Sequence, residues 1–82
     1  MKKVFDVTPN LLNRIMINPD VMVRKPVIKG TRITVQHVLR LLAQGAEYTE
    51  ILSDYPHITQ EDLYACLLFA QQIVDSSAWQ SV

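Results

Sequence analysis

The sequence predicts a mainly helical fold: a three-helix, helix-turn-helix bundle preceded by an arm that contains short β-strands. Two patterns carry this prediction. Apolar residues recur at helical spacing from residue 35 to residue 75, whereas the N-terminal part has only short apolar runs separated by turn residues. With 82 residues, nearly half of them apolar, the chain makes one domain with a modest core. We divide it into an N-terminal arm (1–33), the bundle (34–75) and a tail (76–82).

The arm is expected to hold one short helix and two short strands. Thr8 and Pro9 are typical of a helix start, which predicts one or two turns over residues 9–14. Residues 15–17 predict a strand that ends in the turn signal Asn-Pro-Asp, residues 21–23 continue extended, and residues 27–28 predict a second strand. Strands this short pair with each other or with another copy of the chain, so a dimer is predicted.

Residues 25–34, Lys-Pro-Val-Ile-Lys-Gly-Thr-Arg-Ile-Thr, connect the arm to the bundle, and we call them the basic joint. Gly30 predicts a turn with positive φ, and Thr34 predicts the N-terminal cap of the following helix. The three cations of this stretch either form a binding surface or only keep a connecting segment soluble.

Three helices follow the basic joint. The first is predicted over residues 35–44 and ends at Gly45, and the second over residues 48–54, where Pro56 stops it. Thr59 and Asp62 form a capping box for the third helix, residues 60–75, whose expected core stripe is Leu63, Cys66, Leu67, Ala70 and Val74. Any other small helical bundle fits this pattern as well.

The net charge is zero, but the two halves of the chain differ strongly. Residues 1–40 hold all eight Lys and Arg against two Asp, whereas residues 41–82 hold six Asp and Glu and no cation. Such asymmetry indicates polyanion binding or self-association. The single cysteine, the lack of a signal peptide and the lack of a membrane-spanning apolar run predict a cytoplasmic protein without membrane contact.

Catalytic chemistry is not predicted. His37, His57 and Cys66 lack metal-ligand spacing, and Cys66 lies among leucines on an apolar helix face, as a core cysteine does. With two glycines the chain cannot build a glycine-rich phosphate loop. We therefore expect no enzyme, no metal and no cofactor, and an RNA-processing enzyme is the lowest-ranked reading.

Several motifs resemble the bacterial and archaeal domain-of-unknown-function family 433 across residues 11–74. They are Ile17-Asn18-Pro19, residues 25–35, Gly45, Glu50-Ile51-Leu52, Asp54-Tyr55-Pro56 and Glu61-Asp62-Leu63. The resemblance implies a homeodomain-like helix-turn-helix and, as in several members, a VapB-like antitoxin paired with a PIN-like ribonuclease toxin. The chain departs from the family at two places. Arg24 stands where the family usually has glycine, and Glu47-Tyr48 replaces the family's usual Ser or Thr cap, so the second helix is expected to start less sharply.

These arguments predict an antitoxin-like homodimer that binds a PIN-like toxin and double-stranded operator DNA. The alternative is a helical protein-interaction adaptor that does not bind DNA. The third helix has no cation and begins with Glu61 and Asp62, so DNA is expected to contact the basic joint and the first helix instead. The predicted DNA-binding residues are Arg24, Lys25, Lys29, Arg32, Gln36, His37 and Arg40. Apolar and aromatic residues outside the needs of the core predict protein contacts: Ile15, Ile17, Val27, Ile28, Tyr64, Leu68, Ile73 and Trp79.

Overall fold

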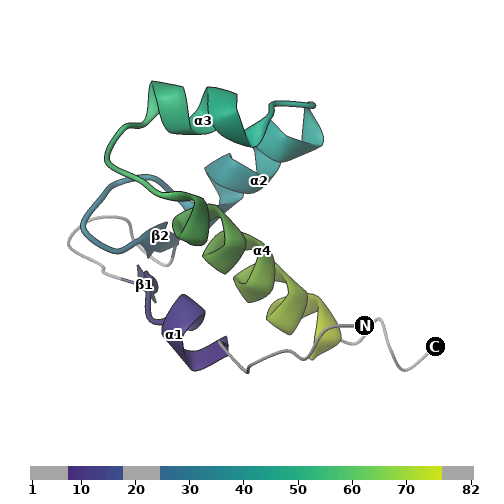
Figure 1. The fold of residues 1–82 in the computed structure, drawn as a ribbon. Helices are drawn as coiled ribbons and strands as arrows, with labels where there is room; N and C mark the ends of the chain where they lie inside the picture. The colour runs from purple at the N-terminus through teal and green to yellow at the C-terminus, as the bar shows by residue number, and fades with distance from the viewer. Residues whose placement is uncertain (1–7, 18–24, 77–82) are drawn as a thin grey trace, which may run out of the picture.

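The computed structural model describes residues 8–17 and 25–76, which form four helices and a two-stranded sheet (Figure 1). The fold is therefore mainly helical, as predicted, and α1 (Thr8–Leu12), the helix expected in the N-terminal arm, packs against the last helix. α1 is shorter than the predicted range 9–14, because the Arg14 N–H donates to the Leu11 carbonyl in a turn, at 3.0 Å. The predictions for residues 1–7, 21–23 and 77–82 lie outside the described residues.

The two predicted strands pair with each other within one chain. β1 (Ile15–Ile17) and β2 (Pro26–Ile28) are antiparallel, with Met16 opposite Val27. The Lys29 N–H extends this pairing by donating to the Arg14 carbonyl at 2.7 Å. The sheet therefore fastens the start of the basic joint to the N-terminal segment.

α2 (Val35–Ala43) has both of its predicted ends. The Thr34 hydroxyl accepts a hydrogen bond from the His37 N–H at 3.0 Å, which confirms the N-terminal cap. Gly45 has a φ of 96°, and its N–H donates to the Leu42 carbonyl at 3.0 Å. The helix thus closes in a left-handed cap that favours glycine at this position.

α3 (Tyr48–Asp54) starts more sharply than its sequence predicts. Glu47 takes the cap position, and its backbone N–H donates to the Glu50 carboxylate at 2.7 Å. This is the half of a capping box in which the third residue of the helix accepts from the N–H of the cap residue, so the helix start is fixed without a Ser or Thr hydroxyl. The predicted range of this helix is confirmed.

α4 (Gln60–Asp75) is opened by the predicted capping box. The Thr59 hydroxyl accepts from the Asp62 N–H at 3.3 Å, and the Asp62 carboxylate accepts from the Thr59 N–H at 2.9 Å. In Figure 1, α1 lies on one side of α4, whereas α2 and α3 lie on the other. Within the described residues, no helix is both long and apolar enough to span a membrane.

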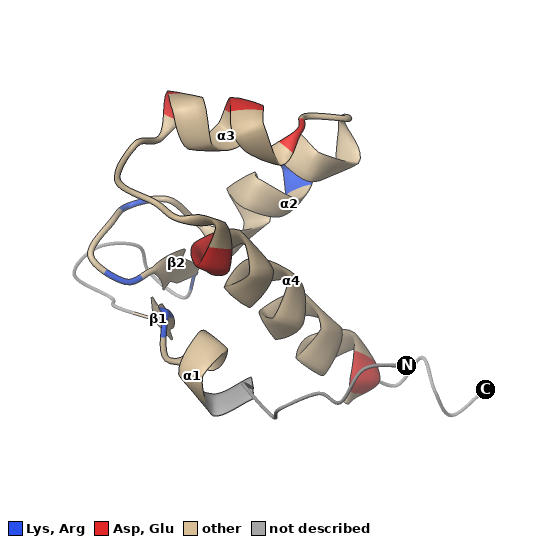
Figure 2. Ribbon diagram, in the orientation of Figure 1, with Lys and Arg blue, Asp and Glu red and all other residues tan. Residues whose placement is uncertain are grey.

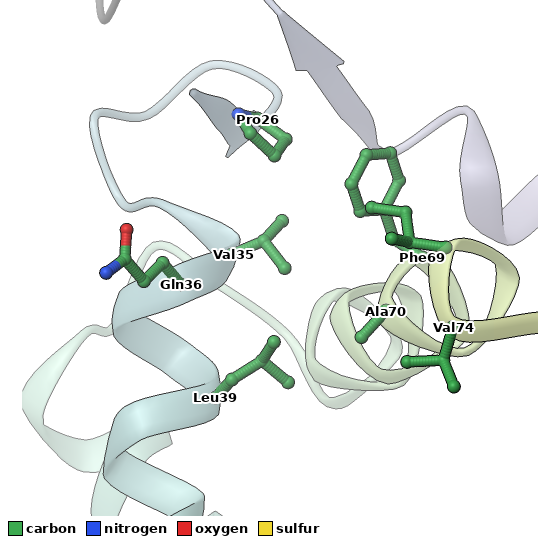
Figure 3. Close-up of a pocket in the computed structure, with 8 residues that line it drawn as sticks. Pro26, Val35, Gln36, Leu39, Phe69, Ala70 and Val74 are labelled. Atoms are coloured by element: carbon green, nitrogen blue, oxygen red, sulfur yellow. The ribbon is translucent and has the colours of Figure 1, made fainter. Parts of the chain in front are cut away.

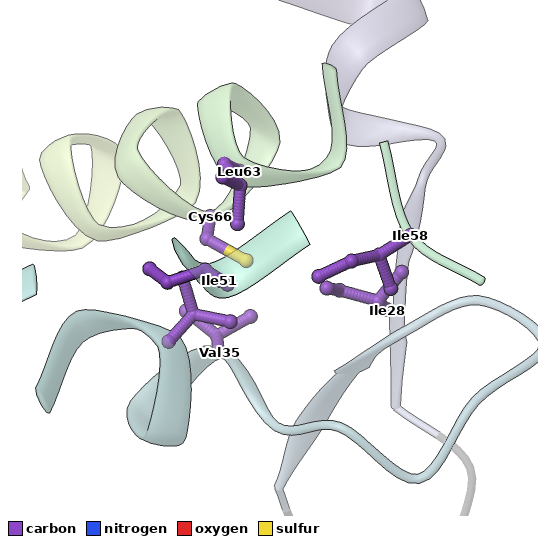
Figure 4. Close-up of a cluster of buried hydrophobic side chains, with 7 residues drawn as sticks. Ile28, Val35, Ile51, Ile58, Leu63 and Cys66 are labelled. Carbon is purple, nitrogen blue, oxygen red and sulfur yellow. The ribbon is translucent and has the colours of Figure 1, made fainter. Parts of the chain in front are cut away.

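The core lies where the sheet, α2, α3 and the first half of α4 meet (Figure 4). It consists of seven buried side chains: Ile28, Val35, Val38, Ile51, Ile58, Leu63 and Cys66. The predicted core stripe of α4 is wrong at Leu67 and Val74, which are 38% and 58% exposed, whereas Ala70 is half-buried. α4 has 16 residues, whereas α2 has nine and α3 has seven, so the two shorter helices cover only part of its length.

Candidate functional site

The basic joint is a hydrogen-bonded turn. The Thr31 N–H and hydroxyl both donate to the Ile28 carbonyl, at 3.0 and 2.7 Å, and Gly30 provides the required positive φ of 82°. Thr31 in turn accepts from the Ile33 N–H at 3.0 Å, and the Ile28 N–H donates to the Ile33 carbonyl at 2.9 Å. These bonds hold the loop between β2 and α2 in one shape before any ligand binds.

The cations of the basic joint point into solvent. Lys25, Lys29 and Arg32 are all exposed, as are Gln36 and Arg40 on α2. Figure 2 shows Lys and Arg on the loop that joins β2 to α2, and Asp and Glu along α3. The structure therefore keeps the charge asymmetry of the sequence as two separate surfaces. Arg24, the remaining predicted cation, lies outside the described residues.

His37 differs from the other predicted DNA-binding residues. It is half-buried, and its Nε2 lies 2.9 Å from the Tyr55 hydroxyl. The two rings also meet edge to face, with centroids 5.9 Å apart. These two interactions connect α2 to the end of α3. The imidazole could contact a DNA base only if its hydrogen bond and ring contact with Tyr55 were broken. Gln36, which is exposed, has no such cost.

The N-terminal end of α4 is less acidic than the sequence suggests. Glu61 is exposed, but Asp62 is buried and forms an ion pair with Arg14, in which Asp62 Oδ1 lies 3.1 Å from Arg14 Nη1. Asp62 therefore caps α4 with one oxygen and binds Arg14 with the other. Sequence reasoning did not identify Arg14, because a pairing across 48 residues leaves no local signal.

Arg14 also borders a polar hollow of about 420 Å³ beside the basic joint. The hollow is lined only by polar and charged residues: Asn10, Asn13, Arg14, Lys29, His57, Thr59 and Asp62. Lys29 thus belongs both to the basic joint and to this hollow. The two features together form one continuous polar surface that carries more cations than free carboxylates.

An apolar groove of about 320 Å³ lies between α2 and the second half of α4 (Figure 3). Val35 and Leu39 point from α2 toward Ala70 and Val74 on α4, whereas Gln36 points away from α4. The full lining is Pro26, Val35, Gln36, Leu39, Phe69, Ala70, Ile73 and Val74. No charged residue lines this groove, so it suits an apolar occupant.

The predicted protein-contact residues fall into three groups. Val27 and Ile28 are buried in the core of the single chain, so they are not available to a partner. Ile15 and Leu68 are half-buried. Ile17 and Ile73 are exposed at 59% and 54%, and Tyr64 is also exposed. Trp79 lies outside the described residues. The groove residues from α2 were missed, because helical periodicity assigns Val35 and Leu39 to the core alone.

Tyr64 is part of a small exposed network on α3 and α4. Its hydroxyl accepts from the Gln60 side-chain amide at 2.6 Å, and its ring meets Tyr48 edge to face, with centroids 5.9 Å apart. An exposed aromatic side chain that its neighbours hold in place loses little entropy when a partner covers it.

Cys66 lies in the core, and burial, followed by the charge of Asp62, raises the pKa of its thiol to about 12. The thiol is therefore protonated at neutral pH and is a poor nucleophile. Among the described residues, no group of three His, Cys, Asp or Glu side chains could hold a metal ion.

Comparison with known proteins gave two matches. The family model described as "Protein of unknown function (DUF433)" matches residues 15–70, a range that contains the basic joint, α2, α3 and most of α4. The crystal structure of a DUF433 member protein from Anabaena variabilis is similar, with a TM-score of 0.70 and 30% sequence identity. The match covers 89% of this chain and 79% of that one. The search of curated proteins found no match.

Proposed function

This chain belongs to the DUF433 family, and we propose that it is an antitoxin-like helix-turn-helix protein that binds operator DNA and a PIN-like ribonuclease toxin. In this proposal α2, α3 and α4 are the homeodomain-like unit, with α3 and α4 as its helix-turn-helix pair. The observation that carries the DNA-binding part is the basic joint, where Lys29 and Arg32 lie exposed on one hydrogen-bonded turn and Lys25 lies exposed directly before β2.

Phosphate neutralisation favours the basic joint over α4 as the DNA contact. Duplex binding draws much of its affinity from cations that release counterions, with a salt slope of about −0.9 per phosphate contact. α4 contains no Lys or Arg, and its exposed first-turn residue Glu61 repels phosphates. Lys25, Lys29 and Arg32 can supply these contacts, with Arg40 extending them along α2.

Base reading falls to Gln36 in this arrangement. Its exposed amide lies on the first turn of α2, directly after the basic joint, and an amide can pair with the donor and acceptor edge of adenine in the major groove. His37 has a different role, because its contact with Tyr55 holds α2 against α3. We therefore assign His37 to positioning rather than to a base contact.

A mobility-shift titration with the DNA upstream of the chain's own gene tests this proposal. Charge reversal at Lys29 and Arg32 should abolish the shift, whereas alanine at Gln60 and Tyr64 should leave it nearly unchanged. Asp54→Asn, which removes an exposed carboxylate from the acidic α3, is a surface-charge control that should not weaken binding. Loss of the shift with the Gln60 and Tyr64 variants alone would instead support an ordinary recognition helix.

The toxin part is supported by the exposed Tyr64 network. Large aromatic side chains held by neighbours are common anchors of protein interfaces. If a PIN-like ribonuclease is encoded beside this gene, the two proteins should copurify after coexpression and this chain should relieve the toxicity. Tyr64→Ala should weaken copurification at least tenfold, with Glu61→Gln as the neighbouring control. Full retention with Tyr64→Ala would place the toxin elsewhere.

A second candidate function is the helical adaptor, and the apolar groove is the observation that favours it. An adaptor needs a protein-binding surface but no phosphate contacts. Retained partner binding together with no shift on any upstream DNA, at low salt as well as high, would support the adaptor over the antitoxin.

A further inference from the structure

We infer that the apolar groove between α2 and α4 receives α4 of a second copy of this chain, which makes an isologous two-fold dimer. Each copy would place its Ile73 in the groove of the other. The inference does not depend on DNA or toxin binding, and it assigns the dimer contact to α4 rather than to the strands.

The first argument is that one short segment supplies both a projection and a recess. Ile73 is 54% exposed and at the same time lines the groove with Phe69 and Ala70. In an isologous interface the same patch of both subunits is in contact, so a patch must fit itself. A segment that carries an exposed apolar side chain beside an apolar recess meets this requirement.

The second argument is electrostatic. Residues close to a two-fold axis face their own copies, so a charged residue there meets a like charge. The α4 sequence from residue 63 to residue 74, Leu-Tyr-Ala-Cys-Leu-Leu-Phe-Ala-Gln-Gln-Ile-Val, contains twelve residues and no charge. Leu63, Ala65 and Cys66 are buried in the single chain, so the exposed part of this segment runs from Leu67 to Val74, and Asp75 is the first charge beyond it. This exposed part can face its own copy without repulsion, and the exposed amides of Gln71 and Gln72 can each donate to and accept from a copy.

The third argument concerns the occupants that the groove disfavours. None of its lining residues is charged, so a basic or acidic helix would lose hydration there without gaining a partner. The cations of the basic joint and the carboxylates of α3 lie on other surfaces (Figure 2). The groove lining includes Pro26 of the basic joint and Gln36, but none of the cations of the joint and no residue of α3.

Light scattering coupled to size exclusion, without DNA, tests the inference. The wild-type chain should elute at twice 9.4 kDa at tens of micromolar, and Ile73→Asp should elute at 9.4 kDa. Ile73→Asp should raise the dimer dissociation constant at least 100-fold, because two carboxylates would meet in an apolar contact. Circular dichroism should show that this variant keeps its helices, since the substituted side chain is exposed in the single chain.

Ile17→Asp is the matched control, because Ile17 is equally exposed, at 59%, but lies on β1. It should remain dimeric. A monomeric wild type, or a dimer that Ile17→Asp breaks and Ile73→Asp does not, would overturn the inference. The assay contains no DNA, so its failure would leave the DNA-binding proposal intact, and a failed mobility shift would leave the dimer intact.

Discussion

The two halves of α4 have similar apolar content but opposite environments. In the first half, Asp62, Leu63, Ala65 and Cys66 are buried. In the second half, Ile73 and Val74 are among the exposed large apolar residues of the described structure, and exposure begins at Leu67, the last residue of the first half. Apolar composition alone therefore does not decide whether a helix face belongs to the core, because burial depends on which neighbours reach it.

The neighbours of the first half explain the difference. At about 1.5 Å per residue, α4 is roughly 24 Å long, whereas α2 is roughly 14 Å and α3 roughly 10 Å long. The core side chains of α2, α3 and the sheet gather around Leu63 and Cys66 (Figure 4). The second half has α1 on one side and the apolar groove on the other. The first half thus supplies the buried core side chains of α4, whereas Ile73 and Val74 of the second half stay exposed in the single chain.

The largest expected difference between the buried and the exposed part of α4 is in the reactivity of a thiol. A thiol-reactive disulfide reagent at pH 8 should label Cys66 at least 1,000-fold more slowly than a cysteine placed at the exposed end of α4 by Ser76→Cys. A rise of the pKa from 9.0 to about 12 removes a factor of about 1,000 from the thiolate fraction, and burial adds a steric barrier. Comparable labelling rates in the native protein would contradict the buried environment of the first half.

The raised pKa of Cys66 also predicts how the stability of the fold changes at alkaline pH. The pKa of Cys66 is raised in the folded state, so its contribution to the free energy of unfolding is complete below pH 9. Above pH 9 the unfolded chain loses the thiol proton and the folded chain keeps it, so this contribution is lost as the pH rises toward 12. Unfolding titrations of the wild type and Cys66→Ala should therefore converge with increasing pH over this range.

Alanine substitutions at Leu63 and Leu67 compare how much a buried and an exposed leucine of α4 contribute to the free energy of unfolding. Leu63→Ala should lower the free energy of unfolding by about 2–5 kcal/mol, because it leaves a cavity in the core. Leu67→Ala, one turn later, should cost less than about 1 kcal/mol, since Leu67 is 38% exposed. Urea unfolding of both variants in an Ile73→Asp background removes any contribution from association. Equal losses would mean that the core face of α4 continues past Cys66 to Leu67.

Local signals in the sequence predicted the boundaries of the elements well. Gly45, Thr34 and the Thr59–Asp62 box act within four residues of the ends they define, and the structure confirms them. The two strands were likewise predicted from short apolar runs between turn residues, and the family resemblance was confirmed by the DUF433 match.

Features that depend on distant neighbours were not predicted. Helical spacing placed Leu67 and Val74 in the core, but spacing says nothing about how far the other helices extend. The Arg14–Asp62 pair joins residues 48 positions apart, and the apolar groove combines α2 with α4. The sequence thus predicted the cations of the basic joint, whereas the groove required the three-dimensional arrangement.

The smallest expected difference in the free energy of unfolding is between substitutions of Asp62 and of Glu61. These two carboxylates lie in the same helical turn, but Asp62 is buried and Glu61 is exposed. Asp62 caps the Thr59 N–H at 2.9 Å and binds Arg14 at 3.1 Å. Asp62→Ala should lower the free energy of unfolding by about 2 kcal/mol, because both partners lose their acceptor.

Asp62→Asn separates the two roles of this carboxylate. Its amide oxygen can still cap α4, while the charge that attracts Arg14 is gone. We expect a loss of about 1 kcal/mol, since Arg14 is partly exposed and water compensates for part of the ion pair. Glu61→Gln should change the free energy of unfolding by less than about 0.5 kcal/mol, because Glu61 is exposed. Thermal or urea unfolding of the three variants measures this order, and equal effects of Glu61→Gln and Asp62→Asn would show that Arg14 contributes nothing to anchoring the first half of α4.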